Sequence, residues 1–170
     1  MSGLQAVALF MERHGLLLVT AESCTAGLIA AHLADVPGAG GLLDCAFVVY
    51  SPEAKKQCLG VSEQTLQVHN LTSEQVAREM AAGALANSER ANMAIANTGL
   101  ADDTDKDVPA GTQCFAWAFR LAKPVDCEQS RLALFSETRR FQGDRSQIRE
   151  ASAYYALESV PRYFEQLTRR

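Results

Sequence analysis

The chain has 170 residues and a formal net charge of −4 at pH 7, with 48% hydrophobic and 21% charged residues. That hydrophobic content is enough for one core, so we expect a single domain over residues 1–170 and exclude wholesale disorder. The acidic balance argues against nucleic acid as a partner, and the longest apolar runs are too short to span a membrane.

Cysteine usage and the N-terminal segment indicate the compartment. Five cysteines, at positions 24, 45, 58, 114 and 127, form no Cys-x-x-Cys pair and leave an odd one over. Such a set is typical of free thiols in a reducing environment rather than of a disulfide frame or a zinc site. A signal peptide contains an uninterrupted apolar stretch, whereas charged residues interrupt the apolar pattern at this N-terminus. We therefore expect no signal peptide and a cytoplasmic protein.

The first half of the chain predicts helices and strands in alternation. Apolar side chains at the i, i+3, i+4 and i+7 spacing predict a helix over 3–14, which Gly15 ends. After it, short apolar or β-branched runs predict strands, and helical patterns predict further helices. The strands are expected at 16–21 and 45–51, and the helices at 25–34, 53–59 and 62–68.

The second half begins with a helix start, because Thr72 is followed three residues later by Gln75, as in a capping box. The last helix is expected to begin at Asp144, where Gln147 completes a second capping box. Between these two helices, strands are expected at 92–99 and 112–122, with one or two more over 130–141.

Strands that alternate with helices predict an α/β fold with three layers, α/β/α, around a mostly parallel mixed sheet. The closing strands are joined by short connections, which favours an antiparallel edge. In such sheets ligand sites lie at the carboxyl ends of the strands. Three loops there carry polar side chains after apolar strands: 22–25, 50–56 and 98–103.

The first loop, "ESCT", places Ser23, Cys24 and Thr25 at a strand-to-helix turn. Small hydroxyl residues are preferred as helix caps, so the local sequence favours a capping role for Ser23 or Thr25. The alternative is a nucleophile whose oxyanion is stabilised by N–H groups at the helix start. Cys24 is either a reactive thiolate or a small buried residue, and the second is the commoner case.

A nucleophilic serine needs a base, and the three histidines, at 14, 32 and 69, fall in or beside helical segments. A lysine can act instead when burial lowers its pKa. Lys55 follows Tyr50 by five residues, so both side chains could approach Ser23 from an adjacent strand. The alternative is an edge tyrosine and solvated lysines, which describes Lys56 better than Lys55.

Six segments resemble, in sequence and in order, the C-terminal domain family of the competence/damage-inducible protein CinA. They are "AESCTAGLIAAHLADVPGAG", "FVVYSPEAKKQCLGV", "TSEQVAREMAAGA", "NTGLA", "PAGT" and "FQGDRSQIREASAYYAL". The resemblance extends over nearly the whole chain, and the family it points to includes nicotinamide mononucleotide deamidases.

The resemblance implies an amidohydrolase that converts nicotinamide mononucleotide to nicotinate mononucleotide and ammonia, without a metal ion or an organic cofactor. At the matching positions Ser23 is the expected nucleophile, and Tyr50 and Lys55 are its activating or proton-transferring partners. The residues expected to bind the substrate or support the oxyanion are Thr25, Thr98, Gly99 and Arg145. Related domains often self-associate, so we expect a homo-oligomer that acts on a small molecule.

One loop departs from the family pattern. Members with the deamidase pattern have a glycine-rich "TGIAGPGGG" loop where this chain reads "TGLADDTDKDVPAGT", with aspartates at 102, 103, 105 and 107. Arg145, at a helix start, would suit a phosphate group, whereas aspartates that face the site would repel one. Ala26 also replaces the first glycine of the family's "ESCTGG".

The acidic loop also raises the possibility of a metal site. Asp103, Asp105 and Asp107 imitate the first half of a calcium loop. However, Val108 stands where that loop has glycine and Cys114 where it has glutamate. A solvated turn is therefore favoured, and no metal site is expected.

Three functions remain open. The chain is an active nicotinamide mononucleotide deamidase, or a paralogue with the same machinery and a substrate that lacks the phosphate, or a non-catalytic member that binds a small molecule or a partner protein. Retention of Ser23, Tyr50 and Lys55 favours an enzyme. The altered loop disfavours the standard substrate.

Overall fold

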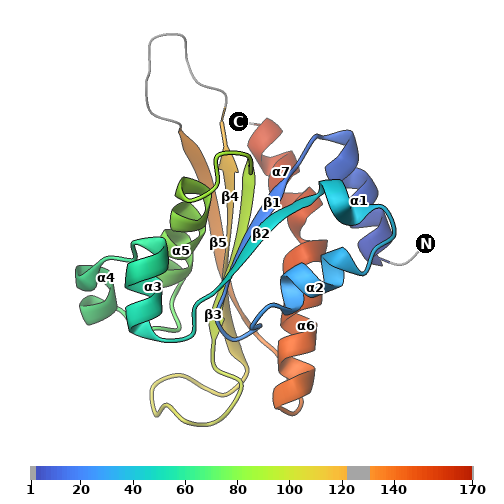
Figure 1. The fold of residues 1–170 in the computed structure, drawn as a ribbon. Coiled ribbons are helices and arrows are strands. Elements are labelled where there is room, and N and C mark those ends of the chain that lie inside the picture. Colours follow the sequence, from blue (N-terminus) through green and yellow to red (C-terminus); the bar gives the residue numbers. More distant parts are fainter. Residues whose placement is uncertain (1–2, 122–130, 170) are drawn as a thin grey trace.

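The computed structural model describes residues 3–121 and 131–169 (Figure 1). The strands are β1 (Leu18–Glu22), β2 (Leu43–Val48), β3 (Met93–Gly99), β4 (Thr112–Arg120) and β5 (Leu132–Arg140). The helices are α1 (Gly3–Arg13), α2 (Leu28–Ala34), the 3-10 helix η1 (Ala39–Gly41), α3 (Pro52–Leu59), α4 (Glu63–Val68), α5 (Glu74–Ala86), α6 (Arg145–Glu158) and α7 (Val160–Thr168). The outer ends of the strands predicted at 112–122 and 130–141, and the cysteine at 127, lie outside the described residues.

The five strands form one mixed sheet in the order β2-β1-β3-β4-β5. β1 pairs in parallel with β2 and with β3, whereas β4 is antiparallel to both β3 and β5. Of the described strands, β4 alone therefore runs against the others. The prediction of a mostly parallel mixed sheet with antiparallel pairing at its closing edge is confirmed.

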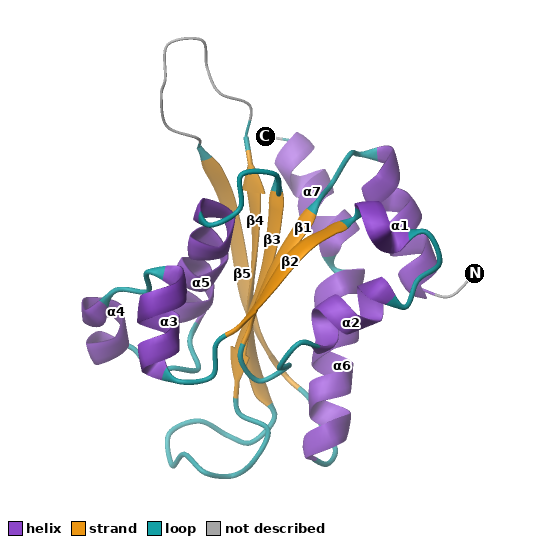
Figure 2. Cartoon of the chain, viewed as in Figure 1, coloured by secondary structure: helices purple, strands orange, loops and turns teal. Residues whose placement is uncertain are grey.

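Helices cover both faces of the sheet (Figure 2). Helices α3, α4 and α5 lie on one side, and α1, α2, α6 and α7 lie on the other. The expected three-layer α/β/α arrangement is thus confirmed. Among the described residues, no helix is long and apolar enough to cross a membrane.

Alternating side-chain size along β4 gives the two faces of the sheet different cores. Phe115, Trp117 and Phe119 face the larger core beneath α1, α2, α6 and α7. The intervening side chains are small and face α5; they are Cys114, Ala116 and Ala118. Because successive strand residues point to opposite faces, this pattern lets α5 approach the sheet closely on the small-residue face.

Two predicted helix starts differ in the structure, and two helices stand where one last helix was predicted. The cap of α5 is Ser73 and not Thr72, because the Ser73 side chain accepts the Val76 N–H at 3.3 Å while the Thr72 N–H donates to the Asn70 side chain. The segment predicted as helix from residue 25 forms turns up to residue 27, where Ala26 and Gly27 both have positive φ. The last helix is divided, since Pro161 has no N–H with which to continue α6.

The cap of α6 is as predicted. The Asp144 side chain accepts the Gln147 N–H at 2.9 Å, and the Gln147 side chain accepts the Asp144 N–H at 2.9 Å. This capping box fixes the start of α6, and with it the backbone of Arg145, at the end of the molecule where β1, β2 and β3 finish.

Candidate active site

The three loops singled out in the sequence meet at one end of the sheet. Ser23 directly follows β1, Tyr50 lies two residues after β2, and Gly99 ends β3. The loop that follows β3 extends from this end, at the bottom of Figure 1. Residues of all three loops line one cavity of about 380 Å³, a volume that suits a small ligand.

The first contact in this cavity joins Ser23 and Lys55. Lys55 Nζ lies 2.9 Å from Ser23 Oγ, although 32 residues separate them in sequence. Ser51 caps α3 and Pro52 begins it, so Lys55 points from the first turn of α3 toward the end of β1. The carbonyl oxygens of Val49 and Tyr50 also accept hydrogen bonds from Nζ, at 3.1 and 3.2 Å.

Lys55 is buried without a compensating carboxylate. Its side chain is 1% exposed, and no ion pair involves it among the described residues. Burial lowers the pKa of Lys55 from 10.5 to about 8. Near neutral pH a usable fraction of this amine is therefore neutral, as a base for the adjacent hydroxyl must be.

The backbone around Ser23 is held by Asn97 of β3, a residue that the sequence analysis did not identify. The Asn97 carbonyl accepts the Ser23 N–H at 3.0 Å, and its side-chain oxygen accepts the Thr25 N–H at 3.0 Å. The Asn97 amide group donates to Gln113 Oε1 at 2.9 Å. Asn97 and Gln113 are both fully buried, so this polar network is shielded from water.

Glu22, the last residue of β1, is a second residue that the sequence analysis missed. Its buried carboxylate accepts the N–H groups of Gly27, Ile29 and Ala30 at 2.9–3.1 Å. The carboxylate thus satisfies orphan donors at the start of α2 and complements the positive end of that helix. Neither Ser23 nor Thr25 serves as the cap of α2, whose N-cap is Gly27.

Cys24 is buried beside the nucleophile candidate. Its thiol accepts a hydrogen bond from Gln113 Nε2 at 3.3 Å, and desolvation by burial raises its pKa. The thiol is therefore protonated near neutral pH, which disfavours a thiolate role. The Cys24 carbonyl accepts a hydrogen bond from Arg149 Nε at 2.8 Å, whereas the Cys24 N–H has no acceptor within the described part of the chain.

Tyr50 and Arg145 form a second group next to the first. Arg145 Nη2 donates to the Tyr50 hydroxyl at 2.8 Å, and Arg145 Nη1 is ion-paired with Asp102. These residues line an adjoining cavity of about 290 Å³, and the lining that it shares with the larger one is Cys24, Tyr50, Gly99 and Leu100. The Tyr50 side chain is 57% exposed, and its hydroxyl bonds to Arg145 rather than to Ser23.

The three other predicted binding residues lie at different depths. Thr98 and Gly99 line the larger cavity, and the Thr98 hydroxyl donates to the Leu71 carbonyl at 2.8 Å. A Cβ on Gly99 would lie 2.2 Å from Gln113 Oε1, so a side chain there would displace the buried Gln113 amide from its hydrogen bonds to Asn97 and Cys24. Thr25 is completely buried and lines neither cavity, and its hydroxyl has no hydrogen-bond partner among the described residues.

The aspartate-rich loop contributes two carboxylates to the walls of these cavities. Asp102 lines the smaller cavity, and Asp105 lines the larger one together with His69 and Asn70. Asn70 donates to Asp105 at 2.9 Å, and this hydrogen bond lowers the Asp105 pKa. Within residues 3–121 and 131–169, no group of three or more His, Cys, Asp or Glu side chains could hold a metal ion.

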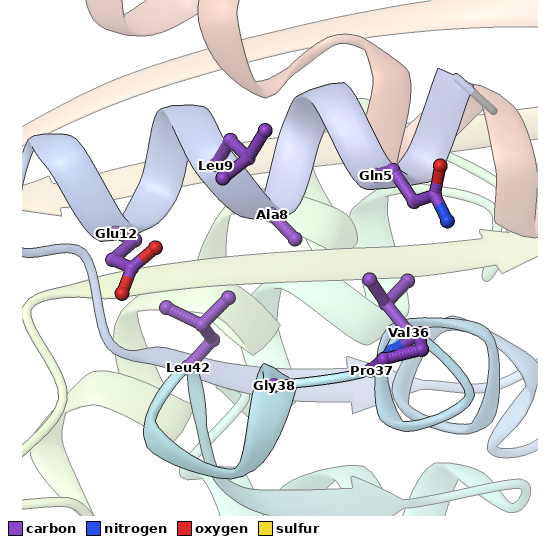
Figure 3. A pocket seen from close by; sticks show the side chains of 8 residues that line it. All are labelled: Gln5, Ala8, Leu9, Glu12, Val36, Pro37, Gly38 and Leu42. Carbon is purple, nitrogen blue, oxygen red and sulfur yellow. The ribbon is translucent and has the colours of Figure 1, made fainter. Parts of the chain in front are cut away.

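A separate cavity of about 290 Å³ lies at the opposite end of β2 (Figure 3). It is bounded by α1 and the 36–42 turn, and its wall includes Leu42, which immediately precedes β2. Figure 3 shows a mostly apolar lining in which Glu12 is the sole labelled side chain with a carboxylate. This groove lacks a nucleophile paired with a base, so the Ser23 cavity is the candidate active site.

The chain is similar to known proteins over nearly its whole length. Residues 3–164 match the family model of the CinA C-terminal domain. A relative from Symbiobacterium thermophilum is 42% identical over 164 residues, and the chain spans only 37% of that relative's length. Nicotinamide-nucleotide amidohydrolase PncC of Escherichia coli is 37% identical over 162 residues, which cover 93% of this chain and 90% of that protein. The crystal structure of competence damage-inducible protein A from Klebsiella pneumoniae has a TM-score of 0.79 at 36% identity, over 92% of each chain.

Proposed function

Because the chain belongs to the CinA C-terminal domain family, we propose that it hydrolyses the carboxamide of nicotinamide mononucleotide to release nicotinate mononucleotide and ammonia. The amidohydrolase name of the Escherichia coli relative, which this chain covers almost completely, supports this substrate class. The observation that carries the proposal is the 2.9 Å contact between Lys55 Nζ and Ser23 Oγ at the wall of the cavity.

In the proposed reaction Lys55 is the general base. The neutral amine has two N–H groups, which donate hydrogen bonds to the carbonyl oxygens of Val49 and Tyr50. The Nζ lone pair is then directed at the Ser23 hydroxyl. Lys55 takes the hydroxyl proton as Ser23 Oγ attacks the carboxamide carbon. The ammonium of Lys55 then gives this proton to the amide nitrogen, and ammonia leaves.

The acyl-enzyme completes the cycle with water. Lys55 deprotonates a water molecule that attacks the Ser23 ester, and the carboxylic acid product leaves as Oγ regains its proton. We assign the Cys24 N–H as one donor to the oxyanion in both steps, since it has no acceptor in the described chain and follows Ser23 directly. No step requires a metal ion or an organic cofactor.

Ammonia release from the purified protein with nicotinamide mononucleotide tests this function. The wild type is expected to turn over, and Ser23→Ala and Lys55→Ala are each expected to lose at least about 100-fold in kcat. Lys56→Ala is the matched control, because Lys56 is the neighbouring lysine of α3 and is ion-paired with Glu63 outside the cavity. Equal losses in all three variants would contradict the assignment.

A non-catalytic or substrate-shifted member is the second candidate, and the ion pair between Asp102 and Arg145 favours it. If the protein releases no ammonia but nicotinamide mononucleotide raises its melting temperature, a binding role is the better account. The cytoplasmic location, the homo-oligomeric state and the extent of a single domain over the whole chain stay predictions.

A further inference from the structure

The cation that would recognise a phosphate in this site is already neutralised. Arg145 Nη1 is ion-paired with Asp102, and Arg145 Nη2 donates a hydrogen bond to Tyr50 Oη at 2.8 Å. Both ends of the ion pair are about half exposed at the mouth of the smaller cavity, where they lie beside Cys24 and Tyr50. A phosphate that approached Arg145 would meet the Asp102 carboxylate beside it, and the two like charges would repel each other.

The remaining charges around the two cavities do not compensate for this loss. The other cation among the lining residues, Lys55, directs Nζ to Ser23 and to two carbonyl groups. Asp105 adds a carboxylate whose hydrogen bond from Asn70 favours the ionised form. The described walls therefore hold two carboxylates, of which Asp102 is paired with Arg145, and one lysine whose Nζ contacts Ser23 rather than a carboxylate.

The charges that line the cavities distinguish between the riboside of nicotinamide and its phosphorylated form, the mononucleotide. The pyridinium ring carries one positive charge, so the unphosphorylated riboside is a cation. A phosphate monoester adds about −1.5 to −2 charges at neutral pH and makes the nucleotide an anion. Asp105, the lining carboxylate that is in no ion pair with a described residue, attracts the first species and repels the second.

We infer that Asp102 is a specificity-determining residue, which cancels recognition of the phosphate by Arg145 and makes the cationic nicotinamide riboside at least as good a substrate as the mononucleotide. This inference rests on the proposed function and names its substrate class: N-ribosyl nicotinamides in which the phosphate contributes little to kcat/KM. Asp102 acts through Arg145 and the local field, and takes no part in bond breaking.

The test compares kcat/KM for ammonia release from the riboside and from the mononucleotide. The wild type is expected to use the riboside at least as well as the mononucleotide. Asp102→Asn keeps the side-chain shape and frees the Arg145 charge, so kcat/KM for the mononucleotide should rise about tenfold while that for the riboside falls about twofold.

Two further variants make the comparison specific. Asp103→Asn is the matched control, because Asp103 is an exposed neighbour that lines neither cavity, and it should leave the ratio of the two substrates within about twofold of wild type. Adding Arg145→Met to Asp102→Asn should abolish the gain for the mononucleotide, since the freed guanidinium would be absent.

The outcomes separate this inference from the proposed function. A wild type whose kcat/KM is higher with the mononucleotide than with the riboside, or an Asp102→Asn variant that changes kcat/KM for both substrates equally, overturns the inference and leaves the function intact. If neither compound releases ammonia, the proposed function fails, and titration calorimetry then tests the inference. Tighter binding of the mononucleotide to Asp102→Asn than to wild type would support the inference, and unchanged binding would overturn it.

Discussion

Ser23 and Cys24 are adjacent potential nucleophiles, and their surroundings separate them. Ser23 Oγ contacts a buried amine, whereas the Cys24 thiol is desolvated, has a raised pKa and is held by Gln113. From the sequence alone, local preference pointed to a helix cap at Ser23 or Thr25. The structure instead gives the donors at the start of α2 to Glu22, which leaves the Ser23 hydroxyl available for Lys55.

Replacement of Cys24 tests this distinction. Cys24→Ser keeps an acceptor for Gln113 and adds no bulk, so kcat/KM for ammonia release is expected to stay within about threefold of wild type. Steady-state kinetics beside Ser23→Ala make the comparison. A loss in Cys24→Ser as large as that in Ser23→Ala would instead identify the thiol as the nucleophile.

Ala26 is a residue whose backbone conformation does not suit its side chain. Its φ of 48° is in the left-handed region, where a Cβ costs about 1–2 kcal/mol. Glycine relieves this strain but also increases the entropy of the unfolded chain, which offsets part of the gain. Ala26→Gly is therefore expected to raise the free energy of unfolding by about 1 kcal/mol, as measured by urea titration.

Ala31→Gly is the matched control for that substitution. Ala31 is an exposed residue inside α2, so glycine there should lower the free energy of unfolding by about 1 kcal/mol. If both variants were destabilised to a similar extent, strain at Ala26 would not be the explanation.

Two asparagines, one just before β3 and one within it, hold backbone groups in similar ways at opposite ends of the strand. Asn97 accepts the Thr25 N–H and donates to Gln113 behind the nucleophile turn. Asn92, just before β3, accepts the Leu17 N–H at 2.9 Å and donates to the Gly15 carbonyl at 2.8 Å. Both fix a loop that flanks β1, but only Asn97 does so at the candidate active site.

This pair gives a prediction that separates positioning from stability. Asn97→Ala is expected to lower the free energy of unfolding by roughly 1–3 kcal/mol, since it strands buried polar groups, and also to lower kcat at least about tenfold. Asn92→Ala should be destabilising without a comparable loss of kcat. Thermal unfolding and steady-state kinetics at a temperature well below both melting points measure the two effects. Equal losses of kcat in the two variants would show that Asn97 has no special role in positioning Ser23.

The elements themselves were largely predictable because each depends on local pattern. The capping box at Asp144 and the alternation of β4 are readable directly from neighbouring residues. The α5 cap was misplaced by one residue, because Thr72 and Ser73 are both good caps and a hydrogen bond from the Thr72 N–H to Asn70 decides between them. The roles of Glu22 and Asn97 could not be inferred, since they depend on partners contributed by other elements of the fold.

In the molecule as a whole, the polar side chains of the candidate active site lie at one end of the sheet. The aromatic core lies on the face of the sheet that α1, α2, α6 and α7 cover. The parallel pairing of β1 with β2 and β3 brings the ends of all three strands to the same edge. This topology explains why loops separated by dozens of residues could be grouped from the sequence. The sequence did not reveal that the acidic loop pairs Asp102 with Arg145, because that contact depends on the path of the loop after β3.

The dependence of kcat/KM on pH tests the central claim, that Lys55 in its neutral form activates Ser23. The pKa of Lys55 is lowered to about 8, and only the deprotonated amine can accept the Ser23 proton. With nicotinamide mononucleotide, kcat/KM for ammonia release should therefore rise tenfold per unit below about pH 8 and level off above it. The residual activity of Lys55→Met should lack this rise. A wild-type profile that is flat between about pH 7 and about pH 10, or the same rise in Lys55→Met, would contradict the account.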